Sequence, residues 1–216
     1  RHRNQGVQGL LGRVAPAELF TTAFECAESD DFDDWSDALK HLRRILGDED
    51  PALVPLILDA LRGAPEHSAS ALSWAIGGYD PPVEEAVPVL ETLLRAPATE
   101  ARKAGADNLG RMGDTALPAV PSLLESLASD PEPGVRETAA KAIGDLGASA
   151  AAAVPALMRA AGSDPWPAVR AAAMSALGEM RGAARDAIPL LDAGLGDPDP
   201  SIRGAARNAL FRIDPD

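Results

Sequence analysis

Apolar residues in this chain recur every three or four positions, within short segments that proline and glycine separate. In the segment 118–129 the apolar positions are Val120, Leu123, Leu124 and Leu127, and after a turn they continue as Val135, Ala139, Ala142, Ile143 and Leu146. This spacing places the apolar side chains on one face of an amphipathic helix. We therefore predict two helices here, named helix A and helix B in chain order.

The helix pair recurs with a period of 33 or 34 residues. An aliphatic residue followed by proline marks helix A, with the proline at 55, 88, 121, 155 and 189. A glycine stands 11 residues before four of these prolines, at 77, 110, 144 and 178, and an arginine precedes three of the glycines by eight residues, at 102, 136 and 170. Such a period is typical of solenoid proteins.

The last unit departs from the pattern. Arg203 stands at the position of the repeat arginine, but Phe211 replaces the repeat glycine. This marks either a true end of the array or a chain cut from something longer.

The turn between the two helices has its own signature, which reads DPEP at 130–133, DPWP at 164–167 and DPDP at 197–200. The first proline ends helix A, and the second starts helix B because its φ angle is already set. The chain contains 43 alanines, the best helix formers. We therefore expect the 19 glycines and 19 prolines to lie between short helices rather than inside them.

A hairpin this short cannot bury its apolar face alone, so neighbouring hairpins must stack and share one core. We predict an all-α solenoid of about five to six hairpins over residues 34–216. Residues 1–33 fall outside the repeat phase. Within this N-terminal extension, apolar residues at helical spacing predict one capping helix from about 16 to 28: Leu19, Phe20, Ala23 and Phe24.

The unit of D-P-x-P, then V-R, then A-A-x-A-L-G resembles the HEAT-repeat family, including its PBS-lyase-like members, over about residues 34–214. The resemblance implies a right-handed α–α superhelix whose B helices line a concave side. It also implies structural pairs of an Asp before the turn with an Arg of helix B, here Asp130 with Arg136, Asp164 with Arg170, and Asp197 with Arg203. Gly63 and Ala96 stand at the place of this Asp in the first half. Exposed pairs of this kind contribute about 0.2 to 1 kcal/mol each, so we expect them to align hairpins rather than hold the fold.

The concave side should carry two columns of side chains that face away from the core. These candidate partner-binding residues are His41, Trp74, Asp107, Lys141, Ser175 and Asn208 in one column, and Arg111, Asp145, Glu179 and Arg212 in the other. Tryptophan and arginine are enriched among residues that dominate binding energy, so Trp74, Arg111 and the turn residue Trp166 are the preferred contacts. The alternative is that both tryptophans pack locally and Arg111 is only solvated.

Composition and charge limit the possible partners. The net charge is −13 with a pI of about 4.6, which disfavours nucleic acid and anionic membranes. Aromatic residues make up only 4% of the chain, which suggests helices that approach one another closely. We expect a cytoplasmic protein, because no apolar run is long enough to span a membrane and the opening residues do not form a signal peptide.

The sequence contains no set of residues that would form a catalytic or metal centre. Cys26 is the only cysteine, and the three histidines are dispersed at positions 2, 41 and 67 without a zinc-binding spacing. Aspartates at 30, 31, 33, 34 and 37 surround Phe32 and Trp35, but a helix N-terminal cap explains them better than a cation site. We therefore predict no catalytic residues, no metal and no cofactor, and do not expect an enzyme.

Three functions remain to be compared. The first is a scaffold or adaptor that binds another protein on the concave face. The alternative is a HEAT-like lyase or tailoring-enzyme subunit that holds a small molecule in the concavity, because similar solenoids include bilin lyase subunits. The third, a HEAT-like DNA glycosylase, requires a basic groove, whereas here Lys141, Arg111 and Arg212 alternate with acidic residues.

Overall fold

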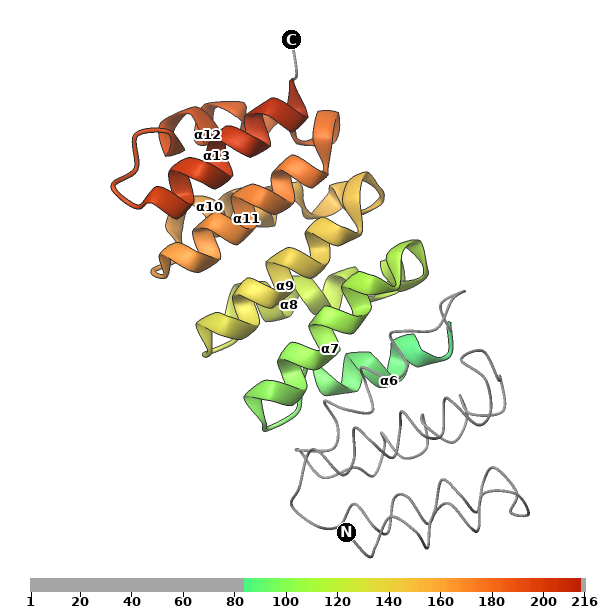
Figure 1. The fold of residues 1–216 in the computed structure, drawn as a ribbon. Helices are drawn as coiled ribbons and strands as arrows, with labels where there is room; N and C mark the ends of the chain where they lie inside the picture. The colour runs from blue at the N-terminus through green and yellow to red at the C-terminus, as the bar shows by residue number, and fades with distance from the viewer. Residues whose placement is uncertain (1–83, 215–216) are drawn as a thin grey trace, which may run out of the picture.

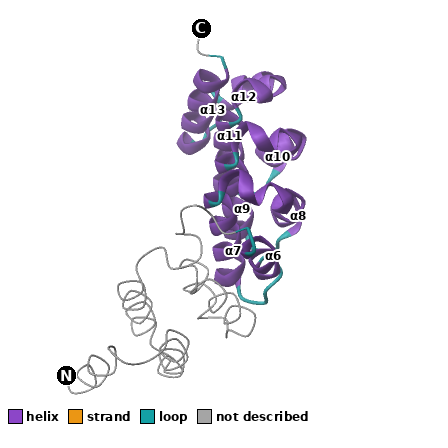
Figure 2. Cartoon of the chain, turned by 90° about the vertical axis from the view of Figure 1, so that its right-hand side faces the viewer, coloured by secondary structure: helices purple, strands orange, loops and turns teal. Residues whose placement is uncertain are grey.

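The computed structural model describes residues 84–214 and shows an α-solenoid in which four helical hairpins stack side by side (Figures 1 and 2). The A helices are α6 (Ala86–Leu93), α8 (Val120–Ser129), α10 (Val154–Ser163) and α12 (Ile188–Gly194). The B helices are α7 (Thr99–Arg111), α9 (Pro133–Asp145), α11 (Pro167–Glu179) and α13 (Pro200–Ile213). No strand occurs in this range, so the predicted all-α solenoid is confirmed. The predicted capping helix at 16–28 and the domain boundary after residue 33 lie outside the described residues.

An aspartate closes three of the four described turns from an A helix to a B helix. The carboxylates of Asp130, Asp164 and Asp197 accept hydrogen bonds from backbone amides two residues later, at 2.9, 2.9 and 2.8 Å. The backbone of Asp130 is extended, as expected before a proline, and this ends α8. Pro133 then lies in the first turn of α9, where a missing amide hydrogen costs nothing.

Short 3-10 helices connect each B helix to the next A helix: η1 (Gly113–Ala119), η2 (Gly147–Ala153) and η3 (Arg181–Ala187). Each connector begins with a residue in the left-handed region, Gly113 at φ 55°, Gly147 at φ 60° and Arg181 at φ 51°. Glycine adopts this conformation freely, whereas a residue with a Cβ atom is strained there. Arginine at the third position therefore carries a conformational cost that its two counterparts avoid.

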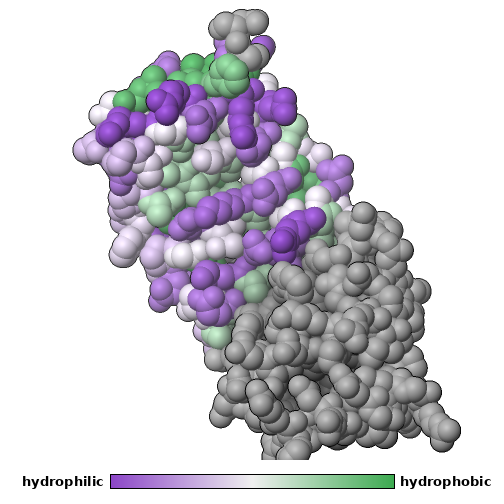
Figure 3. All heavy atoms as spheres, in the orientation of Figure 1, coloured by the Kyte–Doolittle hydropathy of each residue, from purple (hydrophilic) through white to green (hydrophobic). Residues whose placement is uncertain are grey.

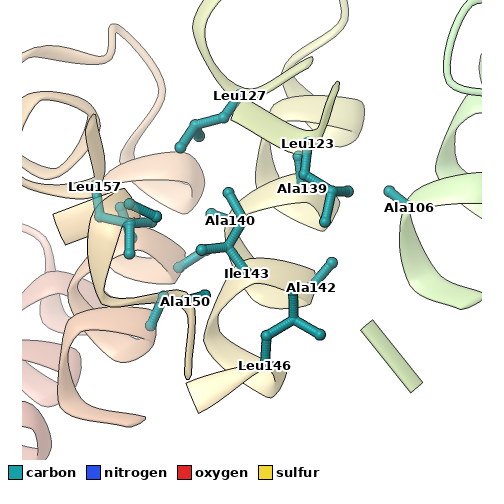
Figure 4. Packing of buried hydrophobic residues seen from close by; sticks show 14 of the residues in the cluster. Ala106, Leu123, Leu127, Ala139, Ala140, Ala142, Ile143, Leu146, Ala150 and Leu157 are labelled. Carbon is teal, nitrogen blue, oxygen red and sulfur yellow. The ribbon is translucent and has the colours of Figure 1, made fainter. Parts of the chain in front are cut away.

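The apolar faces of all four hairpins merge into one core that runs along the stack. Figure 4 shows a section of it, where Leu123 of α8, Ile143 of α9 and Leu157 of α10 pack around the alanines of α9. These three large side chains are fully buried. Of the apolar positions predicted for α8, Leu124 is only half-buried, since it lies at the edge of the core.

Successive B helices touch at their backbones. A Cβ atom added at Gly110, Gly144 or Gly178 would lie only 2.8, 2.9 and 2.8 Å from the Cα atom of an alanine in the next B helix, Ala142, Ala176 and Ala209 respectively. We call these the Gly–Ala contacts. They correct the expectation that glycine lies only between helices, because all three glycines lie inside α7, α9 and α11. Glycine is required at these positions because a larger residue would push the helices apart.

Candidate functional site

The B helices present a row of exposed side chains, which we call the B-helix face. It contains Asp107 and Arg111 of α7, Lys141 and Asp145 of α9, Ser175 and Glu179 of α11, and Asn208 and Arg212 of α13. Figure 3 views the stack from this side and shows hydrophilic side chains in bands across it. The remaining two residues of the proposed columns, His41 and Trp74, lie outside the described residues.

The row is narrow because each B helix is buried on most of its circumference. In α9, for example, Ala139, Ala140, Ala142 and Ile143 are buried against neighbouring helices. Lys141 and Asp145, four residues apart, are left on the exposed side. The backbone contacts between B helices therefore set the spacing of these side chains from one repeat to the next.

Charges of opposite sign pair with each other on the B-helix face. Arg111 lies 4.0 Å from Asp107 within α7, and Lys141 lies 2.5 Å from Glu137 within α9. Arg212 of α13 pairs with Glu179 of α11, which links two repeats. This arrangement is a mixed-charge surface, and it differs from the continuous basic groove that a nucleic acid requires.

The carboxylate of Asp145 has a raised pKa. Although the residue as a whole is exposed, partial burial of its carboxylate raises the pKa of Asp145 above its ordinary value, and the negative charge of Asp107 raises it further. The cations Arg111 and Lys141 oppose this shift but do not cancel it. The burial arises because the carboxylate lies against Gly110, where an added Cβ atom would be 3.1 Å from Asp145 Oδ2.

The turns from A helices to B helices lie along one edge of the stack, which we call the turn edge. Arginines and aspartates at this edge pair between repeats. Arg102 donates to the carboxylate of Asp130 through Nε at 2.7 Å and Nη2 at 3.1 Å, and Arg136 binds Asp164 in the same way at 2.8 and 3.1 Å. The remaining guanidinium nitrogen of Arg136 donates to the backbone carbonyl of Asp130 at 2.8 Å. Each arginine thus joins its own turn to the turn of the following repeat.

This geometry corrects two expectations from the sequence. The carboxylate of Asp130 pairs with Arg102 of the preceding repeat and not with Arg136 of its own, and that of Asp164 pairs with Arg136 and not with Arg170. The pairs are also largely buried, with only 6 to 11% of each side chain exposed. Breaking one should therefore cost more than breaking the exposed pairs that the sequence suggested.

Burial alone would raise the pKa of Asp164, but hydrogen bonds from the Arg136 side chain and the Trp166 amide outweigh it, so the pKa is lowered.

The equivalent arginines of the next two repeats, Arg170 and Arg203, do not bind a carboxylate of the described residues as Arg102 and Arg136 do. Arg170 and Arg203 donate to the backbone carbonyls of Asp164 and Asp197, at 3.0 and 2.7 Å, and neither forms an ion pair with Asp197. Asp197 follows Asp164 by 33 residues, whereas Asp164 follows Asp130 by 34.

Trp166 lies at the turn edge and not in the row of the B-helix face. It immediately precedes α11, and its side chain is 54% exposed. The equivalent turn positions hold Glu132 and Asp199. An exposed indole between two charged turns remains a candidate contact of the turn edge.

Sequence reasoning missed a hollow on the opposite side of the hairpins, between α6 and α8. It is lined by Leu94, Arg95, Ser122, Glu125, Ser126, Ser129, Asp130 and Pro131, none of which belongs to a B helix. An Arg95–Glu125 ion pair of 2.9 Å crosses it. Only the recurrence of serine at 122, 126 and 129 on one side of α8 could have pointed to it.

Within residues 84–214 no group of histidine, cysteine or carboxylate side chains is arranged to hold a metal ion. In the same range, no helix has both the length and the apolar character needed to cross a membrane.

Comparisons with known proteins agree with this architecture. A search of curated proteins found no match. Among solved structures, the complex of CpcE and CpcF of phycocyanin lyase from Nostoc sp. PCC7120 is similar, with 26% identity and a TM-score of 0.62 over 75% of this chain. The match covers 65% of the Nostoc chain, less than two thirds of its length. An engineered protein is similar in fold, with 18% identity, a TM-score of 0.61 and coverage of 94% of this chain and 98% of its own.

The sequence itself matches a family model. The model described as HEAT repeats matches residues 54–142 and again residues 120–211, which together make up more than half of the chain. The matched range includes all four described hairpins except the end of α13. The chain therefore belongs to the HEAT-repeat family.

Proposed function

We propose that this helical-repeat scaffold binds another protein through the B-helix face. The observation that supports this most is the unbroken row of eight exposed side chains on four B helices. Their mutual spacing is fixed by the Gly–Ala contacts, so little conformational entropy is lost when a partner binds.

The charges of the B-helix face indicate what kind of partner fits. Positive and negative groups alternate along the row, with Arg111 near Asp107 and Arg212 near Glu179. A partner with alternating charges can exchange these surface ion pairs for pairs across the interface. Such complementarity gives specificity and speeds association, and arginine, here Arg111 and Arg212, is one of the residue types that dominate binding energy at interfaces.

Photo-crosslinking tests which face is used. A benzophenone amino acid replaces Ser175 in the middle of the B-helix face, and in a matched control it replaces Arg159, which is exposed on α10. In an extract from the source cells, we expect a discrete adduct from position 175 and none from position 159. Adducts of equal yield from both positions, or none from position 175, would contradict the proposal.

A charge-reversal pair provides the energetic test. Arg111→Glu with Arg212→Glu should weaken binding of the crosslinked partner, whereas Arg159→Glu with Arg185→Glu changes the net charge equally at exposed sites away from this face. We expect at least about a tenfold loss for the first pair and less than about twofold for the second. Equal losses would indicate a general effect of net charge.

A second candidate function is a lyase-type tailoring role, which the 26% identity to a phycocyanin lyase structure supports. It requires a ligand pocket among the B-helix columns. The hollow described above is lined by residues of α8 and of the segments after α6 and α8, and by none of the column residues. Titration with a free bilin, followed by its absorbance spectrum, distinguishes the two: a shift that Asp145→Asn abolishes would favour the tailoring role.

A further inference from the structure

The outward side of α13 forms the C-terminal end of the described stack (Figure 1). Met174 and Gly178 of α11 show which side this is, because both contact the following repeat: Met174 lies against Gly194 and Gly178 against Ala209. The residues 33 positions later are Arg207 and Phe211. They therefore point to where a further repeat would stand, and both are exposed.

Phe211 makes this end face unsuitable for another hairpin packed in the same way. Its counterpart Gly178 has no room even for a Cβ atom, since that atom would lie 2.8 Å from Ala209 Cα. A phenylalanine at this position keeps a following B helix away, and its side chain is 70% exposed. The end face is thus an aromatic surface of a different kind from the contacts inside the stack.

The same face is positively charged in a chain that is strongly acidic. Arg207 and Arg203 lie four and eight residues before Phe211, respectively, on one stripe of α13. The Nη1 atom of Arg203 binds the backbone carbonyls of Asp197 and Pro198 at 2.7 and 2.8 Å. Its Nε and Nη2 atoms, which in Arg136 bind a carboxylate, have no acceptor among the described residues. The whole of α13 contains three arginines and no acidic residue.

We propose that this end face binds residues 28–37 of a second copy of the chain. The segment reads ESDDFDDWSD and contains six carboxylates, no basic residue and two aromatic side chains. Carboxylates pair with arginine in bidentate geometry, and aromatic side chains stack favourably on an exposed phenylalanine. The chain itself therefore supplies both halves of a complementary contact.

The contact joins two different parts of the chain, so it is heterologous, and an open assembly has one unused half of each kind at its two ends. Copies of the chain should therefore associate head to tail without closing into a symmetric dimer. This association uses α13 and the N-terminal segment, and it does not depend on a partner at the B-helix face.

Sedimentation velocity of the 216-residue chain tests the proposal. The average mass should rise above the 22.3 kDa monomer as concentration increases, and it should fall when ionic strength is raised from about 0.05 M to about 0.5 M. Arg207→Glu and, separately, Phe211→Ser should each weaken self-association at least about tenfold. Arg159→Glu, with the same charge change on exposed α10, should leave it unchanged.

Mixing two variants identifies the surfaces involved. The Arg207→Glu chain keeps the acidic segment, and a chain with Asp33→Lys and Asp34→Lys keeps the end face. Neither should self-associate, but a mixture should form a one-to-one complex that grows no further. A wild-type chain that stays monomeric, an Arg207→Glu chain that associates like wild type, or a mixture without a complex would overturn the proposal. Circular dichroism checks that each variant is folded.

Discussion

Gly144→Ala tests whether the close approach of successive B helices limits the stability of this fold. In α9 the added methyl group would lie 2.9 Å from both the Cα and the Cβ atoms of Ala176 in α11. Carbon atoms in favourable contact are about 3.5 to 4.0 Å apart. Neither atom of Ala176 can rotate away, so α9 and α11 must separate to admit the methyl group.

Two opposing effects determine the change in stability. Alanine is preferred over glycine inside a helix by about 0.8 to 1.0 kcal/mol, which would stabilise the variant. Overpacking a well-packed core costs about 1 to 3 kcal/mol, and a clash with backbone atoms belongs at the upper end of this range. The free energy of unfolding should therefore fall by about 2 kcal/mol.

Gly204→Ala is the matched control, because Gly204 lies inside α13 and a Cβ atom added there meets nothing within 4 Å. It should gain the helix preference without a clash and stabilise the protein by up to about 1 kcal/mol. Urea unfolding followed by circular dichroism should lower the midpoint for Gly144→Ala by roughly 0.7 M and raise it for Gly204→Ala by roughly 0.3 M, for a denaturant slope of about 3 kcal/mol per M. Equal midpoint shifts of the same sign would refute the packing argument.

Three further predictions follow from the contacts described above. Arg136→Ala should lower the free energy of unfolding by about 2 to 4 kcal/mol, because it leaves the largely buried carboxylate of Asp164 unpaired. Arg203→Ala should lower it by less than about 1 kcal/mol, because Arg203 binds backbone carbonyls and no carboxylate of the described residues. Urea unfolding measures both changes. Arg181→Gly should raise the unfolding free energy by about 1 kcal/mol and the melting temperature with it, since it relieves a left-handed conformation; a lower melting temperature would contradict this. The pKa of Asp145 is raised, so its protonated form favours the fold: the stability it contributes is present at low pH and is lost as pH rises through the folded-state pKa. An NMR titration should find this pKa lowered by Asp107→Asn, and an unchanged midpoint would exclude the coupling.

The periodic sequence was sufficient to predict the hairpins and the exposed positions of the B helices. Each repeat supplied the same apolar spacing independently, so side chains such as Lys141 and Asp145 could be assigned to the exposed side. The fold class followed from the same pattern, because a short amphipathic hairpin has no other way to bury its apolar face than by stacking.

The partner of each aspartate could not be predicted, because a repeating sequence does not distinguish one repeat from the next. Asp130 has an equivalent arginine six residues later, Arg136, and another 28 residues earlier, Arg102. Both choices obey the same pattern, and only the rise from hairpin to hairpin brings Arg102 to the carboxylate. The role of Gly144 was missed for a related reason, since its contact is with a neighbouring helix and not with its own.

The Gly–Ala contacts also determine how the molecule bends. B helices of adjacent hairpins contact one another far more extensively than the A helices do. Each hairpin is therefore wedge-shaped, thinner along its B helix, and a series of such wedges curves towards that side. The radius of this arc is set by side-chain volume at a few interior positions, so it could change during evolution through single substitutions that leave the binding residues untouched.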